Sequence, residues 1–442
     1  MKRKLLKILI YTLLMIITVV YTYKIRVLVD DELFNYGFAK NILDGLIPYK
    51  DFNMIIPPLF AYITAFILKI FGKKLLIYHI LTAFIIIGIT YVSAKKIGKM
   101  SFIIYLLLLI YPYTGYNMFS LFLFFILLNF IILNQKSENK KTFYLEPIII
   151  SLIILTKHTL GLLVIPSLIY SKNRLKTFLI YIISFLILVL YLAINNNIFE
   201  FIDYTILGMF SFTNKNGTSI NFLLIVEFLI IGYLIYKLKK TKSKEYFYVL
   251  MYQIVTFPIV NYVHFMISFI PFIYLIILNY KDKAYFKWFS SVITITFVAT
   301  FTIFFIKDNK EYNSIHETKN FMEGRLVQTI SNRNIDLIEN YIEKYKGYKP
   351  YILSYMAYQI KLNLDYPINK YDLINNGNMG YNGSERYIKE IDKYCKKNKC
   401  IFFINTYEIT EDGFQTNKDI LKYVQNDYKR IYSSNILNIY TN

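Results

Sequence analysis

An acidic segment follows the first long apolar run of this 442-residue chain. It reads VLVDDELFNYGFAKNILDGLIPYKDFNMIIPPL, and its carboxylates are Asp30, Asp31, Glu32, Asp44 and Asp51. A carboxylate can take the proton from a hydroxyl group while that oxygen attacks an electrophile. The same residues can also form an ordinary solvated loop, because charges near a membrane are costly unless they are hydrated, paired or used. The segment is therefore a candidate for general-base chemistry beside a membrane.

Two further polar sites interrupt apolar runs. The segment ILTKHTLGLLVIP contains Lys157 and His158. The lysine either extends to lipid headgroups or neutralises a departing anion such as a phosphate, and the histidine either contacts a substrate or hydrogen-bonds a neighbouring helix. The segment FPIVNYVHFMISFIPF contains Tyr262 and His264. Sugar or phosphate contact is one reading of this second pair, and an interfacial aromatic residue with an interhelical hydrogen bond is the other.

The elements that must position these residues are transmembrane helices. The chain is 56% hydrophobic, above the roughly 45–50% of soluble domains. Runs of about 16–20 apolar residues with almost no charge recur from Leu5 nearly to Ile306, and runs of this length cross membranes as helices. The basic N-terminus lacks an A-x-A-like cleavage site, so we predict a retained first helix rather than a signal peptide.

The positive charge of the chain, formally +21 in total, indicates how the chain is oriented in the membrane. The basic residues cluster in short loops between apolar runs, which is the positive-inside pattern, so no nucleic-acid partner is expected. If these loops are cytoplasmic, the N-terminus is cytoplasmic, the C-terminal part is extracytoplasmic, and the chain is a multi-pass cell-membrane protein. The predicted spans, about eleven, are residues 5–23, 75–94, 101–116, 119–134, 145–156, 159–171, 177–195, 220–237, 246–262, 264–280 and 289–306.

One apolar stretch, Ile55 to Phe71, is predicted not to cross. If it crossed, the basic residues at 95, 96 and 99 would lie outside, against the positive-inside rule. Its two prolines suit the start of a helix after an extended stretch, so we expect a helix at the outer interface; an ordinary span is the alternative. The short spans 145–156 and 159–171 suggest a tight hairpin around Lys157.

The composition changes at Lys307, from where the chain is polar. We predict a transmembrane domain over 1–306, with a first external loop and juxtamembrane helices over 24–74, and a small extracytoplasmic α/β domain over 307–442. Helical patterns appear at NIDLIENYIEKY, SERYIKEIDKYC and NKDILKYVQNDY, and strand-like runs at PYILSY, CIFFIN, YKRIYSS and ILNIY. Their alternation supports βαβ-type layering. Cys395 and Cys400 are compatible with one disulfide or with two free thiols. The segment NNGNMGYNGS indicates a loop and does not match the GxGxxG nucleotide-binding pattern.

The acidic segment resembles the first external loop of the GT-C glycosyltransferases, the polytopic membrane enzymes that use polyprenyl-phosphate sugars, and within them the family 39 and aminoarabinose-transferase type. The resemblance extends over some forty residues and is specific only in combination. The matching positions are Asp31-Glu32, Tyr36, Ala39, Ile42-Leu43-x-Gly45, Pro48-Tyr49-x-Asp51-Phe52, Pro57-Pro58-Leu59 and Phe71-Gly72.

The resemblance implies a GT-C fold and inverting transfer of a sugar to an acceptor on the outer face of the membrane. It implies that Asp31 is the general base, with Glu32 beside it. Asp51 and Tyr36 then join Lys157, His158, Tyr262 and His264 as expected substrate-binding residues. Glu32 and Asp51 would orient the acceptor or raise the pKa of the base through like-charge repulsion. The family often carries a lysine in a hairpin like that around Lys157, which favours a contact with the donor phosphate.

Two departures limit how far the resemblance extends. The aminoarabinose and protein mannosyl transferases carry Lys or His directly before Pro-Pro, where this chain has Ile56. They also carry a second Asp after a later span, where this chain offers Asn117. The substrate and second carboxylate of that branch are therefore not transferred here. No cofactor is expected; a divalent ion on Asp31, Glu32 and Asp51 has no supporting ligand spacing.

The expected partners are a polyprenyl-phosphate sugar donor, membrane lipid, and an acceptor that is a glycan such as a cell-wall polymer, a lipid or a protein. A transporter or flippase for lipid-linked glycans would also explain the spans, but not the acidic loop or the globular tail. A glycan polymerase or ligase usually places a large external loop late between spans, whereas the late polar part of this chain is terminal.

Overall fold

The computed structural model divides the chain into two compact units. The first comprises Met1–Tyr23, Tyr78–Tyr191 and Gly217–Tyr312, and the second Lys24–Ile77, Leu192–Asn216 and Asn313–Asn442. The C-terminal part thus shares a unit with the acidic segment. The predicted domain boundary at 306/307 stays a prediction. The structure describes residues 2–24, 30–110, 112, 115–134, 144–210, 222–255, 262–284, 286, 288, 291–292, 295, 315–317, 326–353, 374, 379–405, 417–435 and 437–442.

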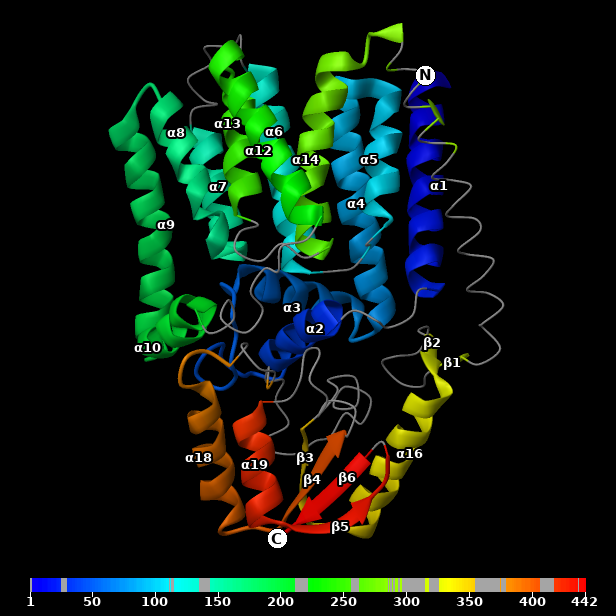
Figure 1. Ribbon diagram of the computed structural model, residues 1–442, viewed down its shortest axis with the longest axis vertical. Coiled ribbons are helices and arrows are strands. Elements are labelled where there is room, and N and C mark those ends of the chain that lie inside the picture. The colour runs from blue at the N-terminus through cyan, green and yellow to red at the C-terminus, as the bar shows by residue number, and fades with distance from the viewer. Residues whose placement is uncertain are drawn as a thin grey trace. The chain divides into compact units, whose positions relative to one another are not determined.

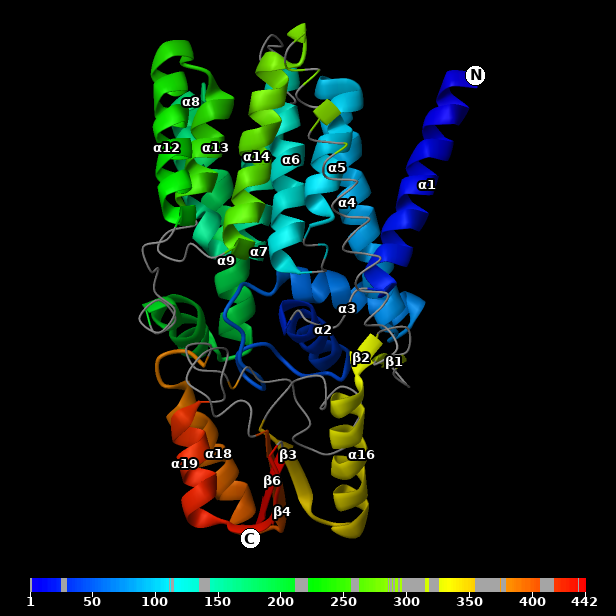
Figure 2. The ribbon, with the colours of Figure 1, turned by 45° about the vertical axis from the view of Figure 1, so that its right-hand side comes forward.

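The first unit is a bundle of helices whose axes run roughly side by side (Figure 1). Seen from a second direction, α1 leans away from the other helices toward its N-terminus (Figure 2). The helices are α1 (Lys2–Lys24), α4 (Leu75–Ile97), η1 (Gly98–Met100), α5 (Ser101–Leu108), α6 (Tyr116–Asn134), α7 (Leu145–Thr156), η3 (His158–Leu163), α8 (Val164–Tyr170), α9 (Arg174–Ile194), α12 (Phe222–Thr241), α13 (Lys244–Ile254) and α14 (Tyr262–Tyr280).

Several helices have the length and composition of membrane spans. Within the described residues, four stretches are long and apolar enough to cross: Leu5–Thr22, Leu76–Leu108, Tyr116–Leu133 and Arg174–Ile194. Shorter apolar helices cover Leu59–Phe71, Leu145–Thr156, His158–Tyr170 and His264–Tyr280. Apolar side chains point outward as well as inward, for example Leu5 at 68% exposure. This is expected of helices that face lipid, where a helix satisfies its own backbone groups.

The predicted number of about eleven spans is not confirmed. Helix α5 ends at Leu108 rather than near residue 116, because Pro112 follows and the residues before a proline disfavour helical conformation. Helix α13 is described to Ile254 rather than 262. The predicted span 289–306 lies largely outside the described residues.

The expected hairpin around Lys157 is confirmed. Helix α7 covers Leu145–Thr156, and the backbone of Lys157 is extended, with φ −145° and ψ 96°. The chain then continues through η3 into α8, and both pack against α7. The reversal places Lys157 at the C-terminal end of α7.

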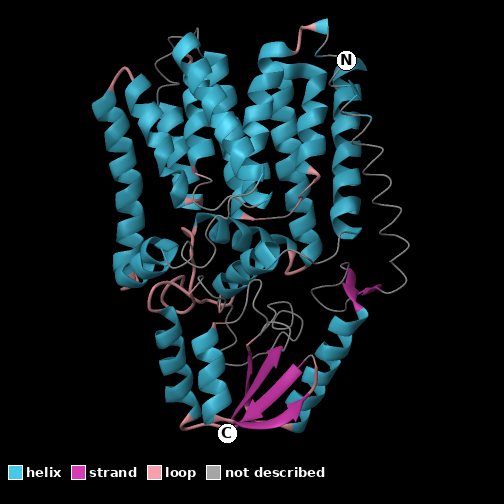
Figure 3. Cartoon of the chain, viewed as in Figure 1, coloured by secondary structure: helices cyan, strands magenta, loops and turns pink. Residues whose placement is uncertain are grey.

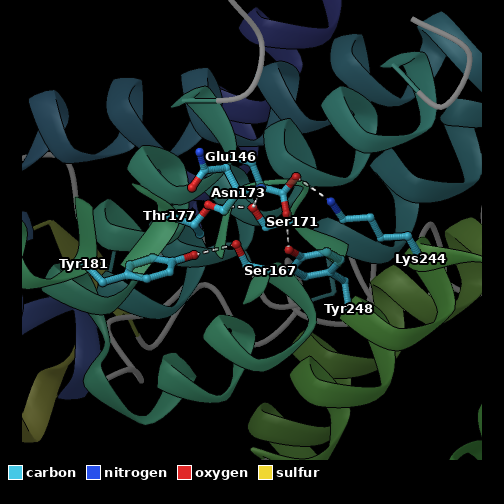
Figure 4. Close-up of polar contacts among 8 residues, drawn as sticks. All are labelled: Glu146, Ser167, Ser171, Asn173, Thr177, Tyr181, Lys244 and Tyr248. Carbon is cyan, nitrogen blue, oxygen red and sulfur yellow. Dashed lines mark hydrogen bonds and ion pairs between the residues drawn. The ribbon is translucent and has the colours of Figure 1, made fainter. Parts of the chain in front are cut away.

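A polar network fixes the opposite end of α7 (Figure 4). The Lys244 Nζ atom lies 2.6 Å from Glu146 Oε2, and the Tyr248 hydroxyl donates to Glu146 Oε1. Nearby, the Tyr181 hydroxyl donates to Ser167 Oγ at 2.7 Å. The contacts of Glu146 join α7 to α13, and the contact of Tyr181 joins α9 to α8, at the end of α7 opposite to Lys157.

The second unit contains two short helices from the acidic segment, two helical segments after α9, and a C-terminal α/β part. The elements are α2 (Asp30–Leu43), α3 (Leu59–Phe71), α10 (Ile198–Phe201), the π-helical η4 (Ile202–Leu207), β1 (Ile315–Glu317), β2 (Leu326–Gln328), α16 (Thr329–Lys344), β3 (Lys349–Ile352), α18 (Gly383–Cys395), β4 (Cys400–Asn405), α19 (Lys418–Asp427), β5 (Lys429–Ser433) and β6 (Leu437–Thr441). Helix α3 begins directly after Pro57-Pro58, as predicted.

The C-terminal part is built on a four-stranded sheet in the order β3-β4-β6-β5 (Figure 3). Strands β3 and β4 are parallel and joined through α18, and the remaining neighbours are antiparallel. One face packs Phe403 and Ile439 against Ile338 of α16. The other face packs Phe402 against Ile391 of α18 and Val424 of α19. The predicted helices and strands of this part are present; β1 and β2 form an additional antiparallel pair that the sequence patterns do not indicate.

Cys395 and Cys400 form a disulfide. It joins the end of α18 to the start of β4, and both cysteines are buried. The structure therefore selects one of the two states that the spacing left open. Structural disulfides persist in oxidising compartments and are rare in the cytosol.

Candidate functional site

Helix α2 carries three of the predicted site residues. Asp31 is the second residue of the helix, and its side chain lies outside the described part of the structure. Glu32 is 2% exposed and Tyr36, one turn later, is 1% exposed, so the two share a buried face. Acidic residues in a first turn also complement the positive end of the helix dipole. The structure thus gives Asp31 a defined backbone position at a helix N-terminus.

Tyr36 has a structural contact. Its hydroxyl donates to the carbonyl oxygen of Lys73 at 3.0 Å, which links α2 to the residues just after α3. Burial, with a smaller contribution from the Asp44 carboxylate, raises the pKa of Tyr36 above its usual value. The predicted role of Tyr36 in substrate binding stays a prediction, because the contact described is within the protein.

Asp44 pairs with two lysines. Its carboxylate lies 2.6 Å from Lys40 Nζ and 2.9 Å from Lys73 Nζ. Partial burial acts to raise the pKa of Asp44, but the hydrogen bonds and charges of the two lysines hold that pKa below its usual range. Asp44 therefore stays ionised and joins the C-terminal ends of α2 and α3. It lies at the opposite end of α2 from Asp31, the candidate base.

The Pro48-Tyr49-x-Asp51-Phe52 motif folds into a closed turn. The Ile47 amide donates to Asp51 Oδ2 at 2.7 Å, and the Asp51 amide donates to Ile47 O at 2.9 Å. Tyr49 has a φ of 68°, an uncommon conformation for a residue with a side chain. Its hydroxyl donates to Ile56 O at 2.6 Å. One oxygen of Asp51 thus organises the turn; its expected substrate contact stays a prediction.

The second predicted group gathers at one end of the helical bundle, where α7 ends and α6 and α14 begin (Figure 1). The Lys157 Nζ atom donates to Asn117 Oδ1 at 2.8 Å and lies 6.0 Å from the centre of the Tyr116 ring. His264 lies in the first turn of α14, at the same end of the bundle (Figure 1). We call these four residues the Lys157 cluster. It provides a cation held in place by an amide, an arrangement suited to a phosphate.

The other two residues predicted around this cluster are less defined. His158 opens η3 and is half-buried. Tyr262 is the first residue of α14, and its side chain lies outside the described part of the chain. The structure therefore places Lys157 and His264 at the same end of the bundle and leaves Tyr262 untested.

A buried carboxylate in the bundle was missed. Glu227 of α12 is 0% exposed, and Gln253 Nε2 donates to its Oε2 atom at 2.7 Å. The same amide nitrogen lies 3.2 Å from Ser268 Oγ, one turn after His264 on α14. The available signal was an acidic residue inside the run FLLIVEFLIIG, since ionisable residues within membrane spans are costly and usually functional.

No group of three or more His, Cys, Asp or Glu side chains suitable for a metal ion occurs among the described residues. The side chain of Asp31 is not among them. A divalent ion on Asp31, Glu32 and Asp51 is therefore untested.

Comparisons with known proteins decide the fold. No protein-family model matches the chain, and no curated protein matches it. The crystal structure of ArnT from Cupriavidus metallidurans in the apo state matches with a TM-score of 0.60 and 10% identity, covering 98% of this chain and 97% of that chain. The chain has a GT-C-like fold.

The structure of the same ArnT bound to undecaprenyl phosphate matches with a TM-score of 0.57 and 10% identity, over 100% of this chain and 98% of that chain. The GT-C resemblance inferred from the acidic segment is therefore confirmed at the level of the fold. Since the match extends over nearly the whole length of both chains, it includes the C-terminal part as well as the helical bundle.

Proposed function

We propose that this protein is a membrane glycosyltransferase that moves a sugar from a polyprenyl-phosphate-linked donor to an acceptor on the outer face of the membrane. The main support is the full-length similarity to a structure that holds undecaprenyl phosphate. The acidic GT-C-like segment and the Lys157 cluster provide the two chemical functions that such a transfer needs.

The proposed step is a single displacement at the anomeric carbon. An acceptor hydroxyl oxygen forms the new bond to that carbon while the bond from the carbon to the phosphate oxygen breaks. The Asp31 carboxylate takes the hydroxyl proton, and the phosphate oxygen leaves with the bonding electron pair. One carboxylate acting on one attacking oxygen inverts the anomeric centre. Glu32, buried next to Asp31, helps to set the charge and orientation of the base.

The proposed leaving group is a polyprenyl phosphate, whose negative charge grows as the sugar departs. Lys157 neutralises that charge, and its hydrogen bond to Asn117 fixes the ammonium before the reaction. Preorganised charge of this kind stabilises a transition state without reorganisation during the step. His158, Tyr262 and His264 are proposed to contact the sugar or phosphate. The proposed acceptor is a cell-wall polymer, a lipid-linked glycan or a surface protein.

The orientation in the membrane yields a testable prediction. We expect a cysteine introduced at Lys389 to react with a membrane-impermeant maleimide on intact cells, because the positive-inside pattern places the C-terminal part outside. The Lys389 side chain is 73% exposed. Both native cysteines are in the disulfide, so the signal comes from the new site.

A cysteine at Lys240 is the matched control. Lys240 lies in the basic last turn of α12, which the same rule places in the cytoplasm, so it should react only after permeabilisation. The opposite labelling pattern would overturn the outward assignment of the C-terminal part.

The function itself can be tested in cells by deleting the gene. We expect one polyprenyl-phosphate-linked sugar to accumulate in lipid extracts, because its consumption would be blocked, and mass spectrometry would identify the sugar. Reintroducing the wild-type chain should return the lipid to its normal level, whereas the Asp31→Asn chain should not. An unchanged lipid profile would contradict the proposed donor class.

A further inference from the structure

The carboxylate of Asp203 accepts hydrogen bonds from residues at the start of α18. Asp203 lies in the π-helical η4 and is 5% exposed. Arg386 Nη2 donates to its Oδ2 atom at 2.8 Å. The Asn382 amide and Asn382 Nδ2 donate to Oδ1 at 3.3 and 3.2 Å. Charge-assisted bonds such as that of Arg386 are stronger than neutral ones, so this contact holds together two segments that are 179–183 residues apart.

Two glycines let these segments approach closely. A Cβ atom on Gly380 would lie 2.8 Å from Tyr204 Cδ1 and 2.9 Å from Asp203 Oδ2, and Gly380 has a φ of +76°. A Cβ atom on Gly208 would lie 3.1 Å from Gly380 Cα. The Arg386 guanidinium carbon lies 5.0 Å from the centre of the Tyr204 ring, within the range of a cation–π contact. The glycine-rich sequence is thus required by the close backbone approach.

The segment formed by α10 and η4 also contacts the loop of residues 46–53, which follows α2 in the acidic segment. Just before α10, Asn197 Nδ2 donates to Pro48 O at 2.7 Å. The Phe201 ring packs edge-on against Tyr49, with ring centres 5.1 Å apart. Phe201 ends α10 where η4 begins. In Figures 1 and 2 the segment that leads into α18 lies beside α10. Contacts therefore run without interruption from α18 through η4 and α10 to the turn that Asp51 closes.

We propose that Asp203 is a positioning residue for the sugar transfer, coupling the C-terminal part to loop 46–53 of the acidic segment. This inference rests on the proposed function for its catalytic meaning. Loop 46–53 follows α2, which carries Asp31, so a shift of the loop moves the helix that presents the base. Asp203 is the buried member of this pair, with a side chain 7% exposed against 39% for Arg386. Removing Arg386 leaves the charge of the buried carboxylate without its cationic partner, which is disruptive. The C-terminal part would thereby control the geometry of the site without touching the reacting atoms.

Hydrogen exchange on the full chain in nanodiscs tests the coupling. Arg386→Gln removes the ion pair, and Gly380→Ala blocks the approach by a steric clash. In both variants, amide exchange in loop 46–53 should accelerate on the order of tenfold, as expected for residues that share one contact network. Arg386→Lys keeps the cation and should restore most of the protection. The amides of Tyr49 and Asp51, which donate to Phe52 O and Ile47 O, are the ones to follow.

Two matched controls separate this coupling from general damage. Lys389→Gln removes an ion pair with Glu385 on the same helix, whose side chains are 73% and 68% exposed. Gly347→Ala imposes a similar backbone penalty at φ +95°, with no other atom within 4 Å of the added Cβ. Neither should change exchange in loop 46–53. Faster exchange confined to residues 379–386 in the two disruptive variants would overturn the coupling.

Activity measurements test the positioning role separately. Binding of undecaprenyl phosphate to purified Arg386→Gln should match that of the wild type. Sugar transfer should fall on the order of tenfold, because the variant misplaces the catalytic base without changing donor binding. Normal transfer by a variant with accelerated loop exchange would overturn the positioning role. If wild-type protein transfers no sugar, the proposed function fails, and the exchange experiment still decides whether Asp203 couples the two segments.

Discussion

The Asp31→Asn variant should lose nearly all sugar transfer while still inserting in the membrane. Asparagine keeps the size and shape of the side chain but cannot accept the proton of the acceptor hydroxyl. General-base catalysis contributes about 10²–10⁴-fold to a rate, so transfer in membranes supplied with a polyprenyl-phosphate sugar should fall by that factor. The amount of protein in the membrane, measured in parallel, should equal that of the wild type.

Asp30→Asn is the matched control for this experiment. Asp30 directly precedes Asp31 at the start of α2, so its replacement makes the same change of charge at the same helix end. It should retain most of the transfer activity. Wild-type activity of Asp31→Asn would show that the base lies elsewhere, with Glu32 and Asp51 the next residues to replace.

The Lys157→Met variant is expected to show the second-largest loss. Methionine fills similar apolar space, but it cannot neutralise the leaving phosphate. Loss of a comparable preorganised contact at an oxyanion costs on the order of 10²–10³ in rate. Arg should replace Lys157 in part, since it keeps the positive charge. The measurement is sugar transfer in membranes with the level of each variant determined.

A lysine that only extends to lipid headgroups would behave differently. Removing a charge near lipid is not destabilising, so Met would then cost little, and near-normal transfer by Lys157→Met would return the residue to that structural role. Lys176→Met provides a control. Lys176 is an exposed lysine in the first turn of α9, and its replacement should leave transfer unchanged.

The elements with strong local signals were predictable from the sequence. The apolar run before Lys157 gave the bounds of α7, Leu145–Thr156, as the structure has them. The prolines before Leu59 marked the start of α3. The apolar runs CIFFIN and ILNIY form β4 and β6, which are buried in the sheet. Each of these signals lies within a few residues of the feature it predicts, so periodicity and turn chemistry are sufficient.

The contacts that define the candidate site were not predictable in this way. Asn117 was noted only as a departure from the family pattern, yet it is the partner of Lys157, 40 residues away. Asp203 and Arg386 are separated by 183 residues, and neither stands out within its own segment. Such pairs depend on how helices pack. Asp51 shows the converse: the resemblance to GT-C enzymes implied a substrate contact, while one of its carboxylate oxygens accepts a hydrogen bond within a local turn.

The most direct test of the proposed transferase is the fate of the donor lipid. The purified chain in liposomes would receive a polyprenyl phosphate that carries a radiolabelled sugar, together with a membrane extract that contains acceptors. A transferase should move the label from the lipid to the acceptor and release an equal amount of polyprenyl monophosphate, with no release by Asp31→Asn. Label that stays on the lipid and only changes sides of the bilayer would contradict the proposal and identify a transporter of lipid-linked sugars.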